Sequence, residues 1–355
     1  MDTAIVLFTR DLRLHDNPAL AGACAHARQV VPLFVVDPAL NVPPNRARFL
    51  ADSLAVLREE LRERGGDLVI RKGDPVAETI ELATRTAAQT VFVAGDVSRY
   101  AARREQRLAR ECGRHRVALE VTPGHAVVPV GDLQPAGGGG HYRVFTPYWR
   151  AWRAWRAAAW RQPCRAPETA SVPAGIEPGD LPFPDRGSSA GLLPGGERAG
   201  RDRATAWLDG PLKAYGDERD LLASDETSRL SAYLRFGCVS PLALAQAALS
   251  RPGGEEFCRQ LAWCDFFHQV TAAFPDIGTE DYRPSPHGPR NWAEDPDALD
   301  AWRAGRTGIP VVDAGMRQLT AEGFMHNRAR MITASFLTRT LGIDWRHGYR
   351  HFREL

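Results

Sequence analysis

Short apolar runs alternate with longer segments of mixed polarity through residues 1–130, and this alternation restricts the fold more than any other feature. Continuously apolar runs of this length are typical of strands buried on both faces of a parallel sheet. Because parallel strands need long crossover connections, helices are expected between them. The pattern predicts a doubly wound α/β domain with a five-stranded parallel sheet, whose strands lie at residues 3–10, 30–37, 67–71, 90–95 and 117–121.

The segments between these strands carry helix-start signals. Asn17–Pro18 and Asp74–Pro75 each place a capping side chain directly before a proline, which is well suited to the first helical position. Two more helices are expected at residues 46–64 and 99–111. The α/β domain is therefore expected to occupy residues 1–130.

Ligands of such sheets bind at the carboxyl ends of the strands. Here that edge carries Arg10, Asp11, Asp37 and Asp96. No GxGxxG motif follows the first strand and no GxxxxGK[ST] motif occurs, which argues against dinucleotide or triphosphate binding of the usual kind. The charged side chains of residues 11–16 are expected to form a salt-bridged turn and helix cap.

Residues 131–200 are expected to connect two domains. The stretch 133–167 has six arginines, no acidic residue and a cluster of aromatic side chains. Basic residues interleaved with aromatics suit nucleic acid, but several tryptophans lie at near-helical spacing, and we favour a packed helical stripe. Seven prolines and seven glycines between residues 163 and 200 then predict a long surface connector.

Composition limits the class of protein. The chain has 355 residues, of which 44% are hydrophobic, and this is enough for two domains with sizeable cores. A net charge of +2 argues against a protein that coats nucleic acid non-specifically. The six cysteines show no CxxC pair and no zinc spacing, so reduced, mostly buried thiols and no metal site are expected. Without a membrane-length apolar run or a signal peptide, a cytoplasmic protein is expected.

The pattern beyond residue 201 is helical, and residues 308–331 are its most informative stretch. Pro310 suits a first helical turn, and Gly323 separates that helix from a second one that opens around Met325. On the second helix Asn327, Arg330 and Met331 lie at i, i+3 and i+4, so they share one face. A carboxamide, a guanidinium and a thioether suit a polar polycyclic ligand, whereas spacing alone also fits an arginine-rich surface helix.

The chain closely resembles the DNA photolyase/cryptochrome family, in its cyclobutane-dimer photolyase branch. The resemblance is carried, in order, by RDLRLHDNPAL (10–20), TSRLSAYLRFG (227–237), QLAWCDFF (260–267), TGIPVVDAGMRQL (307–319) and GFMHNRARMITASFL (323–337). It implies that residues 201–355 form an all-α domain that binds FAD and DNA. Family members continue past the position of Leu355, so this domain is expected to be incomplete at its end, with weak or absent FAD retention.

The resemblance also implies roles for individual residues. FAD contacts are expected from Tyr215, Thr227, Ser228, Arg229, Leu230, Ser231, Asn327 and Arg330. Residues 227–231 would supply hydroxyls and backbone N–H groups at a helix N-terminus. Arg330 would pair with an aspartate beyond Leu355.

Contacts with the damaged DNA are expected from Gln260, Trp263, Asn327, Arg328 and Met331. Trp263 would stack on the extruded pyrimidine dimer, and Asn327 would lie beside the reactive nitrogen of the flavin. Gln260 stands where many dimer photolyases carry glutamate, and Cys264 stands where the family usually has arginine. Trp292 and Trp345 match two members of a tryptophan chain that relays electrons to the flavin.

The implied function is light-driven repair of cyclobutane pyrimidine dimers by electron transfer from reduced FAD. An antenna chromophore, methenyltetrahydrofolate or 8-hydroxy-deazaflavin, is expected in the α/β domain. The expected partner is dimer-containing DNA, bound by a monomer associated with the nucleoid. Two alternatives stay open: a cryptochrome-like FAD photoreceptor without repair activity, and a form unable to hold FAD.

Overall fold

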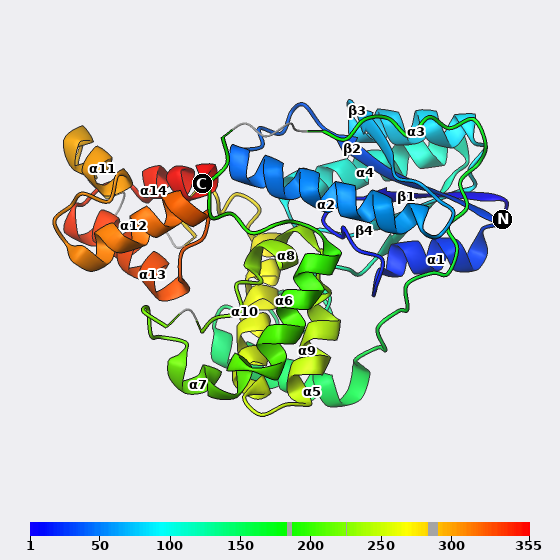
Figure 1. The fold of residues 1–355 in the computed structure, drawn as a ribbon. Helices are drawn as coiled ribbons and strands as arrows, with labels where there is room; N and C mark the ends of the chain where they lie inside the picture. Colours follow the sequence, from blue (N-terminus) through cyan, green and yellow to red (C-terminus); the bar gives the residue numbers. More distant parts are fainter. Residues whose placement is uncertain (183–186, 225, 283–289) are drawn as a thin grey trace.

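The computed structural model describes residues 1–182, 187–224, 226–282 and 290–355. Three groups of elements are visible in Figure 1: an α/β layer structure, a bundle of helices α5 to α10 beside it, and a smaller group of helices α11 to α14. The carboxyl terminus lies near the start of helix α2 (Figure 1).

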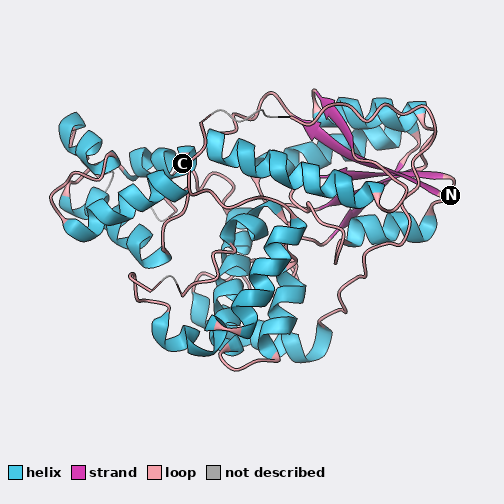
Figure 2. Cartoon of the chain, in the orientation of Figure 1, coloured by secondary structure: helices cyan, strands magenta, loops and turns pink. Residues whose placement is uncertain are grey.

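The N-terminal part is a parallel sheet with the strand order β3-β2-β1-β4-β5, seen as the magenta arrows of Figure 2. Its elements are β1 (Thr3–Phe8), α1 (Pro18–His26), β2 (Gln29–Val36), α2 (Pro44–Arg62), β3 (Val69–Lys72), α3 (Pro75–Arg85), β4 (Thr90–Ala94), α4 (Arg99–His115) and β5 (Ala118–Thr122). The predicted α/β fold and its five strands are confirmed.

The two faces of the sheet are covered by different helices. Side chains that alternate along β1 belong to two separate cores, as the period of two along a strand requires. Ala4, Val6 and Phe8 pack with α1 and α2, whereas Ile5 and Leu7 pack with α3 and α4. The central strands are therefore buried on both sides, which explains their continuously apolar sequences.

The helix caps form as predicted. The side chain of Asn17 accepts a hydrogen bond from the backbone N–H of Leu20, and Asp74 accepts from the N–H groups of Val76 and Ala77. These contacts satisfy backbone donors that the first turn of a helix leaves unpaired.

The connector runs along the outer edge of the sheet. The backbone N–H of Ile70 in β3 donates to the carbonyl of Pro178 over 2.7 Å. Arg58 of α2 donates to the carbonyls of Pro178 and Gly179. The Pro- and Gly-rich segment therefore occupies the side of β3 that β2 leaves free.

The second half of the chain is helical. Its elements are α5 (Phe145–Ala159), α6 (Glu197–Asp209), a 3₁₀ turn η1 (Pro211–Ala214), α7 (Tyr215–Glu218), α8 (Ser231–Phe236), α9 (Pro241–Leu249), α10 (Gly254–Ala273), α11 (Pro296–Arg303), α12 (Pro310–Glu322), α13 (Asn327–Ser335), a π-helical turn η2 (Phe336–Thr340) and α14 (Trp345–Glu354). Helix α6 begins at Glu197, inside the range expected to be connector. No helix of the described residues is both long and apolar enough to span a bilayer.

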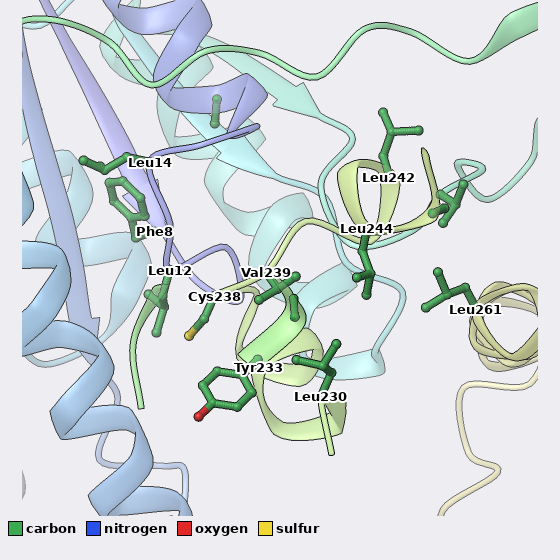
Figure 3. Close-up of a cluster of buried hydrophobic side chains, with 14 of the residues drawn as sticks. Phe8, Leu12, Leu14, Leu230, Tyr233, Cys238, Val239, Leu242, Leu244 and Leu261 are labelled. Atoms are coloured by element: carbon green, nitrogen blue, oxygen red, sulfur yellow. The ribbon is translucent and has the colours of Figure 1, made fainter. Parts of the chain in front are cut away.

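One hydrophobic core joins the sheet to the helical bundle. Figure 3 shows Phe8, Leu12 and Leu14 of the α/β part beside Leu230, Tyr233 and further side chains of the bundle. Helices α11 to α14 have a core of their own, centred on the fully buried Trp302 and Met316. The α/β part and the bundle are therefore fused, whereas α11 to α14 form a separately packed unit.

The turn at residues 11–16 is structural, as predicted, and it also links the two halves of the chain. Arg13 is 1% exposed, and its guanidinium donates to the carbonyls of Asp16, Gly124 (3.1 Å) and Gly237 (2.9 Å). Asp16 in turn accepts from Ser240 at the start of α9. The sequence did not indicate this second role.

Replacing Arg13 by methionine is expected to lower the free energy of unfolding by about 3–5 kcal/mol, because buried carbonyls and carboxylates lose their cation. Urea denaturation of both proteins measures the difference. Arg28→Met is the matched control, since Arg28 is 87% exposed and lies 3.9 Å from Asp2. An equal effect of both substitutions would contradict the role assigned to Arg13.

Candidate functional site

Helices α12 and α13 meet at a glycine, as predicted. Pro310 occupies the first turn of α12, and Gly323 ends that helix in a left-handed conformation with φ 62°. A side chain at Gly323 would come within 3.0 Å of Asn45 on α2. Helix α13 starts at Asn327, where the ring of His326 caps it by accepting from the N–H of Arg328.

The segment 227–231 differs from its prediction. Helix α8 starts only at Ser231, and Leu230 precedes it without any side-chain cap. Leu230 is instead buried in the core at 1% exposure, and Arg229 adopts a left-handed conformation with φ 50°. Residues 227–230 are therefore a loop in front of the helix. Leu230 is held by packing and not by a cap. The expectation that residues 227–231 form the N-terminus of a helix is therefore wrong.

One ion pair joins this loop to the α12–α13 junction, and a second joins α13 to the segment after α7. Arg229 lies 2.6 Å from Glu322 at the end of α12, and its guanidinium covers the ring of Phe324 at 4.5 Å. Arg328 on α13 pairs with Asp220 at 2.7 Å, just after α7. The predicted FAD residues at 227–231 and the predicted residues of α13 are thus gathered in one region.

The remaining members of this region are Tyr215 and the outer face of α13. Tyr215 begins α7, contacts Phe257 edge to face, and has a pKa raised by burial to about 12. Asn327 donates to the thioether of Met331 over 3.9 Å, and Met331 is 55% exposed. Asn327 and Met331 face outward and are available to a ligand, whereas Tyr215 is packed against the core of the bundle.

Arg330 lies away from any acidic partner. Among the described residues no ion pair to it occurs, and its guanidinium lies over the ring of Phe352 at 4.9 Å. Burial and then the nearby charge of Arg46 lower its pKa. A cation in this setting favours an anionic group in its neighbourhood.

Trp263 lies on a different helix and has different neighbours. Its indole stacks on Phe145 with 3.6 Å between ring centroids and 7° between planes, and it also stacks on Phe267. Within the described part of the chain, its ring contacts are all with α5 and α10, and none joins it to Asn327. The structure therefore gathers the predicted flavin residues but does not connect Trp263 to them by contact.

The two positions that depart from the family pattern lie on the same helix as Trp263. Gln260 is half-buried, and Cys264 is accessible to solvent. A thiol at this position cannot supply the positive charge of an arginine. All six cysteines are free, and three of them are buried, fewer than the sequence suggested.

Trp292 and Trp345 lie in the smaller helical unit. The N–H of Ala293, next to Trp292, donates to the carbonyl of Gly342 in the loop that precedes α14. Trp345 starts α14 and donates its indole N–H to Asp281 over 2.6 Å. Each indole is covered by an arginine guanidinium. Both tryptophans are therefore partly exposed residues that pack against neighbouring side chains.

A cluster of arginine, aspartate and histidine side chains at the carboxyl edge of the sheet was predicted only in part. Arg10 pairs with Asp96 at 2.9 Å and donates to the carbonyl of Arg235. Burial, followed by the charge of Arg10, lowers the pKa of His125 to about 3 and of His268 to about 4. The sequence located Arg10 and Asp96 at this edge, but the two histidines and Arg235 come from distant segments.

The other two acids of this edge are engaged elsewhere. Asp37 accepts a hydrogen bond from the hydroxyl of Tyr100 over 2.5 Å. Asp11 is 1% exposed and accepts from the backbone N–H of Thr9 and from Asn17. Both carboxylates are therefore bonded to groups outside the Arg10–Asp96 cluster.

Asp265 is a buried carboxyl that the sequence did not indicate. It is 2% exposed and accepts from the N–H groups of Val127 and Val128 and from the indole of Trp152. Desolvation outweighs these three contacts and raises its pKa from 3.8 to about 7. The sole sequence signal for this buried carboxyl was an acidic residue within an aromatic-rich helix. No group of three or more metal-binding side chains occurs in the described residues.

The raised pKa of Asp265 predicts how the stability of the protein depends on pH. Its folded pKa lies above its unfolded value, so its stabilising contribution is present below about pH 4 and is lost as pH rises through 7. The shift corresponds to an energy on the order of 4 kcal/mol. The lowered pKa values of His125 and His268 act in the opposite direction as pH falls below 6.5.

The difference between the wild type and Asp265→Asn therefore isolates the carboxyl. Between pH 5 and pH 8 this difference in the free energy of unfolding is expected to change by a few kcal/mol, with the wild type losing stability as pH rises. Denaturant unfolding at several pH values measures it. Tyr148 and Cys264, which face Asp265, have pKa values raised beyond this window. A constant difference would contradict the assigned pKa.

Comparison with known proteins agrees with this architecture. Residues 4–168 match the family model described as DNA photolyase, and residues 257–355 match the FAD binding domain of DNA photolyase. A deoxyribodipyrimidine photo-lyase of Streptomyces griseus is 49% identical over 100% of this chain and 79% of its own length. A cryptochrome DASH of Natronomonas pharaonis is 36% identical over 99% of this chain and 79% of its own length.

Solved structures give the same result. The bacterial class III photolyase from Agrobacterium tumefaciens superposes with a TM-score of 0.93 at 32% identity, covering 100% of this chain and 76% of that one. An archaeal photolyase from Sulfolobus tokodaii, crystallised with two FAD molecules, has a TM-score of 0.84 at 28% identity, covering 99% and 78%.

Proposed function

The chain belongs to the DNA photolyase/cryptochrome family, and from this membership we propose that it splits cyclobutane pyrimidine dimers in DNA under light. The electron would come from reduced FAD. The observation that carries the proposal is the gathering of loop 227–230 and helix α13 through the Arg229–Glu322 and Arg328–Asp220 ion pairs. This arrangement presents hydroxyls, cations and a carboxamide to one ligand.

The residues of this region fit FAD. The hydroxyl of Thr227 is buried without a hydrogen-bond partner, so it can bond to a polar group of a ligand. Ser228 and Ser231 add hydroxyls, and Arg229 adds a cation for the pyrophosphate. Asn327 would hold the isoalloxazine ring through its carboxamide. When bound, FAD supplies the light absorption and the electron, while these residues bind and orient it.

The exposed part of α13 suits the damaged base. Met331 and Asn327 face solvent, and Arg328 can neutralise a phosphate. Phe145 and Phe267 both stack against the Trp263 indole, so a flipped base would contact the part of the ring that they leave uncovered. Stacking on an aromatic side chain contributes about 1–3 kcal/mol per base, which offsets part of the cost of extruding the dimer.

The sheet-edge cluster of Arg10, Asp96, His125, Arg235 and His268 is the proposed antenna site. Its members interact electrostatically at the carboxyl ends of β1 and β4, with two arginines against one aspartate and a neutral His268. An anionic heteroaromatic ring, such as a folate or a deazaflavin, matches the net positive charge. The cluster lies beside the bundle, because Arg10 donates to a backbone carbonyl of α8.

A cryptochrome-like photoreceptor is the second candidate. Cys264 favours it, because an uncharged thiol stands where dimer photolyases carry a phosphate-binding arginine. The loss of one cation predicts weaker and less salt-dependent DNA binding. Such a protein would bind FAD and respond to light without repairing DNA.

The deciding experiment measures repair directly. The protein, loaded with FAD and reduced, is mixed with an oligonucleotide that contains one thymine dimer and is illuminated with blue light. Restoration of the intact thymines in light, and none in darkness, is the expected result. Light-induced flavin reduction with no dimer splitting would favour the photoreceptor, and absence of both would contradict the two candidates.

Replacing Trp263 by alanine is expected to weaken binding of dimer-containing DNA at least about tenfold, because one base loses its stacking surface. Trp263→Phe keeps an aromatic face and should lose less. Fluorescence anisotropy with damaged and undamaged duplexes measures both. Phe274→Leu is the control, since Phe274 ends the same helix and is 37% exposed. Equal effects of the alanine and control substitutions would contradict the role.

Arg229→Met is expected to lower FAD affinity about tenfold, through loss of a charge-assisted contact with the pyrophosphate. Calorimetric titration of the FAD-free protein measures the change. Glu322→Gln removes the acid that pairs with Arg229 and should leave FAD affinity unchanged or raised. If both substitutions lower affinity equally, the ion pair matters for folding rather than for the cofactor.

A further inference from the structure

Five aromatic rings form a stack that leads from the surface of α10 into the core. The successive ring centroids are 5.7, 3.6, 6.5 and 5.3 Å apart, with interplanar angles of 23°, 7°, 12° and 29°, along the order Phe267, Trp263, Phe145, Trp149, Trp152. Phe267 at the outer end is 54% exposed, and Trp152 at the inner end is fully buried. The residue proposed to stack on the damaged base is therefore part of a continuous aromatic path to the interior.

The inner end of this path has a partner that can take a proton. The indole N–H of Trp152 donates to Oδ2 of Asp265 over 2.8 Å. Asp265 is buried, so its carboxylate is held in a setting that favours the neutral acid. Burial raises the pKa of Asp265 to about 7. This value is below pH 8, so the carboxylate is still the main form at that pH.

Other tryptophans of the described chain are placed differently. The indole nitrogens of Trp160 and Trp207 are buried without a hydrogen-bond partner. Trp302 donates to the carbonyl of Thr333, which cannot take a proton under ordinary conditions. Trp345 donates to the carboxylate of Asp281, but that contact is exposed to solvent.

We propose that Trp152 and Asp265 form a buried proton-coupled redox pair that takes up an oxidising equivalent from Trp263 through the stacked rings. The role at Trp263 rests on the proposed function. A one-electron photo-oxidant, either the excited flavin or an added compound, first removes an electron from Trp263. Trp152 then gives one electron along the stack and restores Trp263. The N–H bond of Trp152 breaks and its proton forms an O–H bond on Asp265, which leaves a neutral indolyl radical and a neutral carboxylic acid.

Burial favours this end point. Before the transfer the interior holds a carboxylate, and afterwards it holds two uncharged groups, so the unfavourable desolvation of the carboxylate is relieved. The same proton transfer at an exposed pair gains nothing from desolvation. The oxidising equivalent is therefore expected to settle at Trp152, and the indole that meets the DNA base is returned to its reduced form.

The test uses the full chain at pH 8 with a photoexcited ruthenium tris-bipyridyl complex as oxidant and persulfate as the final electron acceptor. Electron paramagnetic resonance of rapidly frozen samples detects neutral tryptophanyl radical. A long-lived radical is expected in the wild type. It should fall at least tenfold in Trp152→Phe, and in Asp265→Asn, which keeps an oxygen for the indole N–H but cannot take the proton at neutral pH.

Trp155→Phe is the matched control, because Trp155 lies on the same helix as Trp152 but is in none of the ring pairs that form the stack. It should leave the signal unchanged. Phe145→Leu, which interrupts the stack, should delay the radical. Circular dichroism checks that each variant is folded. If Trp152→Phe is unfolded, the single variants Asp265→Asn and Phe145→Leu carry the test. An unchanged radical in Asp265→Asn, or an equal loss in Trp155→Phe, would overturn the proposal. Neither FAD nor DNA is needed, so a failure of dimer repair would leave this result standing.

Discussion

The fold depends on one buried arginine at the end of the first strand. Arg13 joins the turn after β1 to the carbonyl of Gly237 at the end of α8, and thereby holds the sheet against the helical bundle. Gly237 makes this approach possible, since a Cβ atom there would lie 1.7 Å from the carbonyl oxygen of Arg10. A desolvated guanidinium needs acceptors in fixed positions, so these contacts favour the observed arrangement of the two halves.

The helical half is attached in two different ways. The bundle shares a continuous apolar core with the sheet, whereas α11 to α14 pack around Trp302 and reach the rest through polar contacts. Among those contacts are the pairs of Arg229 with Glu322 and Arg328 with Asp220. The proposed flavin site lies along this polar boundary. The exposed Arg328–Asp220 pair contributes little stability by itself, so a bound ligand would strengthen the junction as well as use it.

The sequence predicts what is local and misses what distant segments create. Strands and caps were found because apolar runs and residues such as Asn17 act on their immediate neighbours. The start of α8 was misplaced because Leu230 is held by the core, which no local signal reveals. On α13, Asn327 and Met331 are in contact, as the i, i+4 spacing predicts, whereas Arg330 packs against Phe352. Asp265 and His268 could not be found, since their altered pKa values arise from burial against segments more than a hundred residues away.

The path of the connector has a consequence for how the protein behaves at high concentration. Its carbonyl at Pro178 accepts from the backbone N–H of Ile70 on the outer side of β3, so this donor is not available to a foreign strand. Glu120 on the opposite edge strand β5 is exposed, and a charge on an open strand discourages edge-to-edge association. Both edges of the sheet therefore carry a feature that opposes strand-to-strand aggregation.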